Sequence, residues 1–344
     1  MNPPDETITL PNSPDVPGLS FRHFRGPSDY PGITSTGNAS REASGAELVL
    51  SVDDIALEYA HQVNTDPVQD MIIAEIDGNF VGYSQGDWSQ EKSGLIRYWF
   101  ELNLMPERWG LGIRRAMLLW MEARMRQVAA EHPPDAPKTF ATDAPEKAVT
   151  IANLLEGEGY RPARYFNKMT QLLDEPLPDF PMPPGLEMRP VLPEHYRQIW
   201  DASQEAFMDH WGFSPAPDEY YHWWLEDPVI FTPELWQVAW DIEKDEIAGQ
   251  VRTFIDVLEN ERYKRLRGYT EMISVRRPYR RRGLARALIA QSLRVLKAQG
   301  MTESALSVDT ESLTGATRIY EDCGFRVTSR SIAYRKPLEI GSET

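Results

Sequence analysis

The stretch that decides the fold is Val275-Arg276-Arg277-Pro278-Tyr279-Arg280-Arg281-Arg282-Gly283-Leu284-Ala285. The residues before it, 269–275 (Tyr-Thr-Glu-Met-Ile-Ser-Val), are rich in β-branched and aromatic side chains, which predicts a strand. After it, apolar residues between 285 and 296 recur every three or four positions, as on one face of an amphipathic helix. Gly300 ends that helix. The Arg/Gly stretch is therefore predicted to be a turn from a strand into a helix.

The residue types in this turn indicate what it binds. Unpaired backbone N–H groups at the start of a helix attract anions. Gly283 lets a ligand approach the backbone, and Ala285 adds no bulk. The arginines place positive charge in a chain whose formal net charge is −16. The turn is predicted to hold a pyrophosphate; a solvated basic turn without a ligand is the alternative.

Two segments carry a resemblance to a known family. Arg280-x-x-Gly283-x-Ala285 resembles the Arg/Gln-x-x-Gly-x-Gly/Ala signature of the GNAT superfamily of N-acetyltransferases, in which the turn holds the pyrophosphate of acetyl-CoA. After a short predicted strand at 305–309, Ile319-Tyr320-Glu321-Asp322-Cys323-Gly324-Phe325 is similar to the family's Leu-Tyr-x-x-x-Gly-Phe segment. The resemblance implies acetyl-CoA as cosubstrate and an amine as acceptor, but it does not identify the amine.

The resemblance also implies which residues bind and react. The cosubstrate site is expected at the end of the central strand and along the turn, at Val275, Arg280, Arg281, Arg282, Gly283, Leu284 and Ala285. Tyr320 matches the tyrosine that in many GNAT enzymes lies near the CoA sulfur, and a tyrosine pKa near 10 suits a thiolate leaving group. A tyrosine that only packs in its helix is the alternative for Tyr320.

Acetyl transfer also needs a base, because the attacking amine must be neutral. Glu271, on the central strand, is the candidate; a strand carboxylate that faces solvent or an arginine is the alternative. Asp309, at the end of the next strand, is a rival base or a substrate-binding residue, and the family often has Asn in the loop that follows. The resemblance also places His210 in the region that lines the acceptor site in GNAT folds, where it would anchor or deprotonate the amine; a structural or loop histidine is the alternative.

The order of predicted elements repeats in the two halves of the chain. A Pro-rich linker, residues 172–185, separates them. The predicted class is α/β (an α+β mixed sheet), with two tandem GNAT-like domains, each a central mixed β-sheet flanked by helices, at 19–171 and 186–338. Residues 1–18 are predicted to be a flexible tail. The chain resembles tandem GNAT proteins, and among them the actinobacterial group that includes mycothiol synthase.

The first half lacks parts of both segments. Matching Gly110-Leu111-Gly112 to Gly283-Leu284-Ala285 places Glu107 where the family has Arg or Gln. Leu155, four residues before Gly159, stands where the second half has Tyr320 and has no proton to give. The first half is thus predicted to be a structural or substrate-shaping remnant, and binding of CoA through the backbone of residues 109–112 stays open. The Gly-, Pro- and Ser-rich stretch 26–45 is predicted to be a loop.

Composition limits the remaining possibilities. A pI near 4.9 argues against general affinity for nucleic acid. Cys323 is the single cysteine, so no intrachain disulfide forms, which fits the cytoplasm. No apolar stretch approaches the roughly 20 residues that span a bilayer. No Cys/His pattern predicts a metal. The expected partner is a small-molecule amine, with no nucleic acid and no membrane, and the protein is expected to be a monomer or a homodimer.

Three functions are consistent with these residues. The first is an acetyl-CoA-dependent N-acetyltransferase that acts on a primary amine of a small molecule by direct transfer. The second is a CoA-binding sensor or scaffold without turnover, suggested by the incomplete first half. The third is acetylation of a cysteinyl amino-sugar, as in mycothiol synthase.

Overall fold

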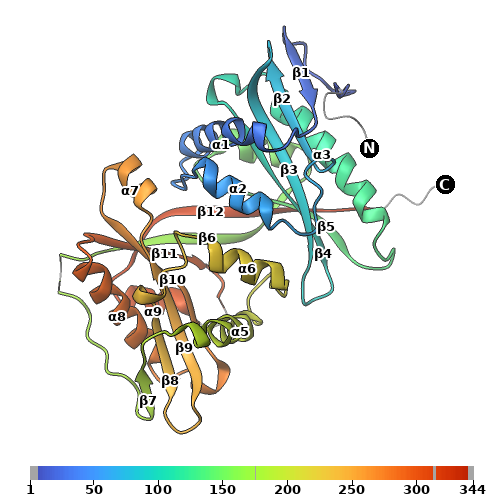
Figure 1. Ribbon diagram of the computed structural model, residues 1–344. Helices are drawn as coiled ribbons and strands as arrows, with labels where there is room; N and C mark the ends of the chain where they lie inside the picture. The colour runs from blue at the N-terminus through green and yellow to red at the C-terminus, as the bar shows by residue number, and fades with distance from the viewer. Residues whose placement is uncertain (1–6, 175, 313–314, 340–344) are drawn as a thin grey trace. The chain divides into compact units, whose positions relative to one another are not determined.

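A computed structural model describes residues 7–174, 176–312 and 315–339 of the chain (Figure 1). Contacts divide it into two compact units. Unit 1 takes the chain up to Ala163 together with the residues from Ile332 onward, and unit 2 takes Arg164–Ser331. Each unit is a mixed β-sheet with helices packed on it. Among the described residues no helix is long and apolar enough to cross a membrane.

The described residues of the first half of the chain contain ten strands and α-helices, including a helix within the stretch 26–45 that was predicted to be a loop. In order they are β1 (Leu19–Arg22), α1 (Tyr30–Ser44), α2 (Val52–Ala60), β2 (Met71–Ile76), β3 (Asn79–Gln90), β4 (Ile96–Leu104), α3 (Ile113–Ala130), β5 (Lys138–Pro145), α4 (Val149–Gly157) and β6 (Arg161–Leu172).

The second half repeats this order and adds a short helix before its central strand. Its elements are β7 (Leu186–Met188), α5 (Tyr196–Phe207), α6 (Asp218–Glu226), β8 (Gln237–Asp241), β9 (Glu246–Phe254), α7 (Val257–Tyr263), β10 (Arg267–Val275), α8 (Leu284–Ala298), β11 (Glu303–Asp309), α9 (Ala316–Asp322) and β12 (Arg326–Pro337).

The two units exchange their last strands. In each unit the first five strands are neighbours in chain order, and only the fourth and fifth pair in parallel. In unit 2 the next strand is β6, from the first half of the chain, which pairs antiparallel with all of β11. In unit 1 it is the end of β12: Thr139 Oγ1 on β5 donates to the Lys336 carbonyl at 3.1 Å.

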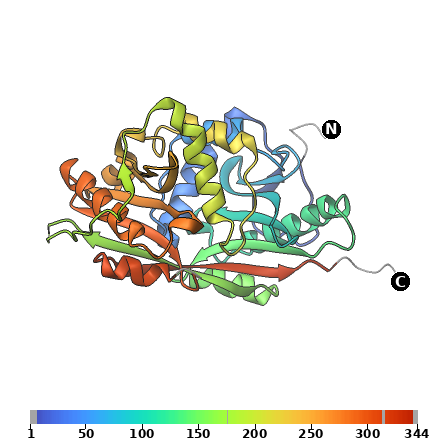
Figure 2. The same cartoon turned by 90° about the horizontal axis from the view of Figure 1, so that it is seen from below.

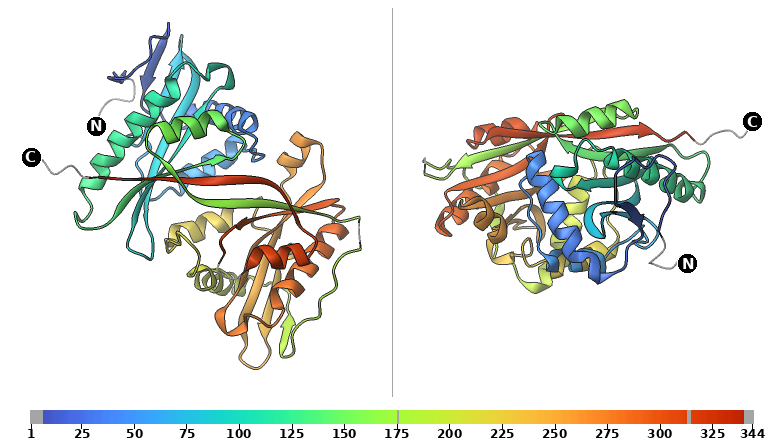
Figure 3. Two further views of the ribbon diagram at one scale, coloured as in Figure 1. Left: turned by 180° about the vertical axis from the view of Figure 1, so that it is seen from behind. Right: turned by 90° about the horizontal axis from the view of Figure 1, so that it is seen from above.

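Both long strands therefore take part in both units. Within unit 2, β12 lies on the outer side of β6, where Thr328 Oγ1 donates to the Lys168 carbonyl at 3.3 Å (Figures 2 and 3). The predicted domain boundaries follow the order of the chain, whereas the compact units follow contacts. The two divisions differ because most of β6, from the first half of the chain, belongs to unit 2, and the end of β12, from the second half, belongs to unit 1. The predicted linker also lies within unit 2.

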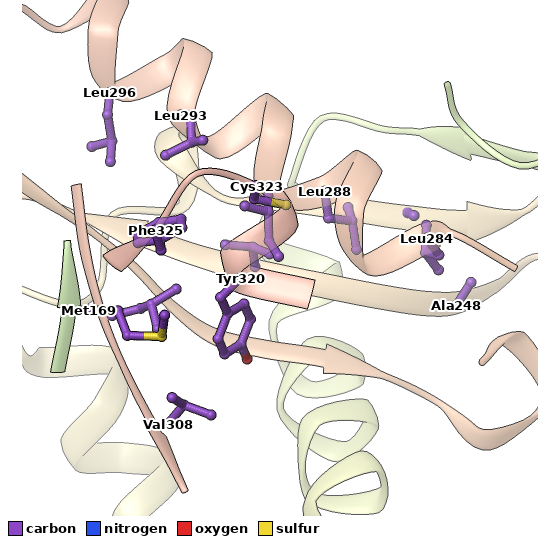
Figure 4. Close-up of a cluster of buried hydrophobic side chains, with 14 of the residues drawn as sticks. Met169, Ala248, Leu284, Leu288, Leu293, Leu296, Val308, Tyr320, Cys323 and Phe325 are labelled. Carbon is purple, nitrogen blue, oxygen red and sulfur yellow. The ribbon is translucent and has the colours of Figure 1, made fainter. Parts of the chain in front are cut away.

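The sheet of unit 2 is covered on both faces. Successive strand residues point to opposite faces. On β9, the Gln250 amide donates to the Ile199 carbonyl of α5 at 2.7 Å, while Thr253 Oγ1 shares a hydrogen bond with Ser292 Oγ of α8 at 2.8 Å. One face therefore carries α5 and the other carries α8. The core on the α8 face includes α9 and β11 (Figure 4).

β10 and β11 separate soon after they begin. They pair only through Arg267–Tyr269 and Glu303–Ala305, although β10 continues to Val275 and β11 to Asp309. A bulge lies in β10 between Glu271 and Ser274, where Met272 has a φ of 49°. A bulge bends a strand and redirects its side chains. The result is a gap between the two central strands, bordered by the end of β10.

The prediction of a loop over residues 26–45 is wrong, because α1 occupies Tyr30–Ser44. Its Gly, Ser and Thr residues have low helix propensity, so packing stabilises this helix. Ile33 is buried, and a Cβ placed on Gly37 would lie 2.8 Å from the Tyr83 hydroxyl. The small residues are what allow the helix to approach β3.

Part of the predicted tail also makes contacts. Residues 1–6 lie outside the described residues, but Thr7 forms a bridge with Arg22, and the Ile8 amide donates to the Phe21 carbonyl at 2.7 Å. Leu10 is buried. From Thr7 onward the segment therefore packs on unit 1 beside β1.

The exchange of strands predicts that the end of β12 stabilises the other unit. A chain that stops after Ser331 exposes the edge of β5, and we expect its melting temperature to fall by about 10 °C or more. Limited proteolysis should then cut within unit 1 before unit 2. A chain that stops after Glu339 is the control, since it removes only residues 340–344. Equal melting temperatures for both shortened chains would contradict the prediction.

Candidate active site

The Arg/Gly stretch forms the predicted turn from strand to helix. A single 3-10 turn, Arg277–Tyr279, follows β10, and Gly283 then caps α8 in the left-handed region with a φ of 90°. No side chain caps α8, so its first N–H groups are available to an anion. A Cβ on Gly283 would meet nothing within 4 Å among the described residues. The approach to the helix N-terminus is open.

The arginines of the turn have different surroundings. Arg280 is used to hold the turn: its Nε donates to the Val275 carbonyl at 3.0 Å and its Nη2 to the Ala206 carbonyl of α5 at 3.0 Å. Arg282 Nη2 donates to the Pro184 carbonyl at 2.6 Å. Arg281 is exposed and has no hydrogen bond or ion pair with the described residues. Of the three, it is the cation most available to a ligand.

Asp209, just after α5, fixes this arrangement electrostatically. Its carboxylate accepts hydrogen bonds from Arg277 Nε at 3.0 Å and from Arg280 Nη1 at 2.8 Å. These bonds and charges hold the pKa of Asp209 well below its usual range, so the group stays ionised. Asp209 is thus a positioning residue that joins α5 to the turn.

Glu271 lies at the gap between β10 and β11. Its carboxylate Oε1 accepts a hydrogen bond from the Ser307 amide of β11 at 2.7 Å. Burial raises the pKa of Glu271 to about 7, against the opposing effects of the Ser307 and Met272 amides and the Lys168 charge. A carboxylate with a pKa near neutrality is suited to accept a proton from an amine. The role of Glu271 as the base stays a prediction, as does the alternative of a strand carboxylate that faces solvent or an arginine.

Tyr320 comes from α9 on the other side of the gap. It is 8% exposed and packs in the core of the α8 face (Figure 4). Burial raises the pKa of its phenol, and the charge of Glu271 adds to the shift. The hydroxyl is therefore protonated near neutral pH. The structure brings the two predicted catalytic residues together.

His210 and Asp309, the predicted acceptor-binding residues, are also neighbours. Burial lowers the pKa of His210, and the charge of Arg280 lowers it further. The charge of Asp309 opposes this shift. Asp309 is already engaged: its Oδ1 accepts from the Glu311 amide at 2.9 Å, and its Oδ2 lies 3.4 Å from Arg164 Nε. These contacts weaken the idea that Asp309 is the base.

Sequence reasoning missed the contribution of β6 to this region. The Arg164 guanidinium lies 5.1 Å from the centre of the Trp211 ring, and Phe166 lies 6.4 Å from the same ring. Further along β6, Lys168 lies opposite Ser307 of β11 and lowers the pKa of Glu271. The strand belongs to the first half of the chain, and no feature of its sequence shows that it completes the second sheet.

The corresponding turn of unit 1 requires a correction to the predicted alignment. Gly112, with a φ of 81°, caps α3 as Gly283 caps α8. Three residues before Gly112 is Trp109, whose Nε1 donates to the Leu104 carbonyl at 2.9 Å, just as Arg280 Nε donates to Val275. Trp109, and not Glu107, therefore stands at the position of Arg280.

Other groups fill the space above this turn in unit 1. Arg114, at the position of Ala285, is 7% exposed and lies 4.8 Å from the centre of the Trp109 ring. A Cβ on Gly112 would lie 3.3 Å from Cβ of Pro14, in the N-terminal segment. Leu155 is fully buried and stands at the position of Tyr320, as predicted. The Tyr160 amide donates to the Leu155 carbonyl, just as the Phe325 amide donates to the Tyr320 carbonyl.

Comparisons with known proteins agree with this geometry. The family described as acetyltransferase (GNAT) matches residues 196–325. The chain is 27% identical over 314 residues to the mycothiol acetyltransferase of Salinispora arenicola, covering 90% of this chain and 94% of the relative. The crystal structure of a GCN5-related N-acetyltransferase from Sphaerobacter thermophilus is similar at 26% identity and a TM-score of 0.70, covering 98% and 99% of the two chains.

A further structure, a tandem GNAT protein from the clavulanic acid biosynthesis pathway, has a TM-score of 0.64 at 13% identity and covers 94% of this chain and all of that one. At that identity it supports the fold alone. The family match and the mycothiol acetyltransferase relative identify an acyltransferase. More narrowly, residues 196–325 match the GNAT family, whose cosubstrate is acetyl-CoA, and over most of its length the chain is similar to a mycothiol acetyltransferase and to structures with the tandem arrangement. In the described residues no group of three His, Cys, Asp or Glu side chains is placed to hold a metal ion.

Proposed function

We propose that unit 2 transfers the acetyl group of acetyl-CoA to the primary amine of a small molecule by direct attack. The observation that carries the proposal is the Glu271 carboxylate, with a pKa of about 7, at the gap between β10 and β11 and near the phenol of Tyr320. A base and a proton donor on opposite sides of one gap suit the two proton transfers of aminolysis.

The cosubstrate would bind along the turn and into the gap. Its pyrophosphate would contact the N–H groups of Gly283, Leu284 and Ala285, with Arg281 as the available cation, while Arg280 and Arg282 hold the turn in shape. Its pantetheine arm would follow the edge of β10 near Val275, beyond the point where β11 stops pairing.

The reaction would proceed in three steps. Glu271 takes a proton from the ammonium group, directly or through water, and the free amine nitrogen attacks the thioester carbon. Backbone N–H groups at the gap stabilise the tetrahedral oxyanion. The carbon–sulfur bond then breaks, Tyr320 donates its proton to the leaving thiolate, and the second proton lost by the nitrogen as the amide forms restores the phenol, directly or through water. Holding both substrates in one gap supplies much of the rate.

A second candidate is a particular acceptor class. Likeness to a mycothiol acetyltransferase over nine-tenths of the chain supports acetylation of a cysteinyl amino-sugar. His210 lies near Asp309 at the end of β11, and Arg164, which contacts the Trp211 ring, pairs with the same carboxylate. A CoA-binding scaffold without turnover is not favoured, because unit 2 retains both groups that the chemistry requires.

Removing the hydroxyl of Tyr320 tests the proton donor. We expect Tyr320→Phe to lower kcat by about 100-fold, with the dissociation constant of acetyl-CoA unchanged, because the phenol acts on the leaving group. Steady-state rates and calorimetric titration measure the two effects. A variant that keeps the wild-type kcat would remove Tyr320 from the mechanism.

The pH dependence tests Glu271. Below its pKa the carboxyl group is protonated and cannot accept a proton, so kcat/KM should rise about tenfold per pH unit and level off above about pH 7. Glu271→Gln should lose this inflection and about 100-fold or more in rate. An unchanged profile in the variant would assign the inflection to another group.

Titration of acetyl-CoA tests which turn binds it. We expect one site per chain, because Arg114 and Pro14 cover the turn of unit 1. Gly283→Glu, which adds a carboxylate and strains a left-handed residue, should abolish binding. Gly112→Glu is the matched control and should leave binding intact. A second site that persists in Gly283→Glu would show that unit 1 also binds CoA.

A further inference from the structure

An arginine on β9 is buried without a counter-charge. Arg252 is 5% exposed, and its Nε and Nη1 atoms are buried with no hydrogen-bond partner. Its guanidinium lies 5.0 Å from the centre of the Trp224 ring of α6. Among the residues that the structure describes it forms no ion pair and no hydrogen bond. Burying an unpaired charge is costly, so this placement requires an explanation.

Two further polar atoms on the same side of the sheet are buried and unpartnered. Gln250, two residues before Arg252 on β9, uses its amide nitrogen to bond the Ile199 carbonyl, but its Oε1 has no partner. Ser203 lies one turn further along α5, and its Oγ also has none. The face of β9 beneath α5 and α6 thus holds donors and acceptors that the described protein groups do not satisfy.

This face also carries the proposed base. Arg252 and Glu271 are direct partners in the antiparallel pairing of β9 and β10, and side chains directly opposite each other point to the same face. The Glu271 carboxylate turns toward the Ser307 amide of β11, whereas the guanidinium reaches toward Trp224 of α6. A molecule whose amine meets Glu271 would have Arg252 within about the length of an arginine side chain.

We infer that the acceptor carries an oxyanion, a carboxylate or a phosphate, and that Arg252 binds it while the amine lies at Glu271. The inference rests on the proposed acetyl transfer in unit 2. A guanidinium matches the geometry of either oxyanion through two parallel hydrogen bonds. The Trp224 ring fixes the plane of the guanidinium by a cation–π contact, and Gln250 and Ser203 are available to hydroxyl or N–H groups of the same molecule.

Pairs of acceptors that differ only in the anion test the inference. β-Alanine and 5-aminovalerate are compared with their primary amides, and 2-aminoethyl phosphate with 2-aminoethanol. For the wild type we expect a higher kcat/KM for the charged member of at least one pair. The pair that shows the preference distinguishes a carboxylate from a phosphate.

Variants of Arg252 show whether the preference comes from this side chain. Arg252→Met should raise KM for the charged acceptor by about 100-fold, the loss of a paired charge, with kcat within threefold and with KM for the neutral acceptor unchanged. Arg252→Lys keeps the charge but not the fork and should raise KM about tenfold. Arg114→Met in unit 1 is the matched control, since Arg114 also lies buried on a tryptophan; it should leave both constants unchanged.

Two outcomes of these experiments would overturn the inference. The first is a wild type with a higher kcat/KM for the neutral member of every pair, or for a neutral amino-sugar than for every charged acceptor. This result would overturn the inference without contradicting the proposed acetyl transfer. The second is an equal loss of kcat/KM for the charged and the neutral acceptor in Arg252→Met. This result would also overturn the inference, and it would assign Arg252 a packing role.

If no amine is acetylated, the proposed function fails. Binding of an anion then tests the oxyanion site separately. Glutarate or inorganic phosphate should raise the melting temperature of the wild type but not that of Arg252→Met. If Arg252→Met does not fold, the increase for Arg252→Lys should be smaller than the increase for the wild type. Equal shifts in wild type and variant would overturn the site.

Discussion

The separation of β10 from β11 is the constraint on which the rest of unit 2 depends. Two neighbouring parallel strands normally bond along their length, yet here the pairing stops after Tyr269 and Ala305. The bulge at Met272 turns β10 away, and the Glu271 carboxylate takes over the Ser307 amide that a backbone carbonyl would otherwise have bonded. One side chain thus compensates for part of the lost pairing and brings a carboxylate to the gap. The elements around it follow from this: Asp209 ties the turn to α5, and α9 places Tyr320 beside the same gap.

The exchange of β6 and β12 gives the first half of the chain a structural part in both units. In unit 1, Arg114 stands where unit 2 has the small residue Ala285, and Leu155 stands where unit 2 has the phenol of Tyr320. The sheet of unit 1, however, is completed by the end of β12, and the sheet of unit 2 is completed by β6. Because β6 also carries Arg164, Phe166 and Lys168 to the region of Trp211 and Glu271, the first half of the chain supplies side chains to the site of the second unit.

Local patterns predicted much of the second unit. The turn, the helix after it and the position of Tyr320 follow from residues close together in the sequence, where periodicity and glycine positions are informative. Three features depend on distant contacts and were missed. Helix α1 forms from residues of low propensity because β3 packs against it. The turn of unit 1 was aligned two residues too early, because Gly110 and Gly112 both have positive φ values and only the cap identifies the equivalent of Gly283. The destination of β6 is a property of the sheet and has no local signal.

The two buried arginines show why burial alone does not identify a site. Arg114 and Arg252 each lie on a tryptophan with unpartnered nitrogens, and burial lowers the pKa of each to about 10, so both stay charged near neutral pH. Their surroundings differ. Arg114 lies at a turn that Pro14 covers and in a unit that lacks the phenol, so a ligand bound there would meet no reacting group. Arg252 is paired in register with Glu271, the proposed base, so both side chains point to the same face of the sheet. The same residue type in the same aromatic contact is therefore consistent with a closed remnant in one unit and with substrate selection in the other.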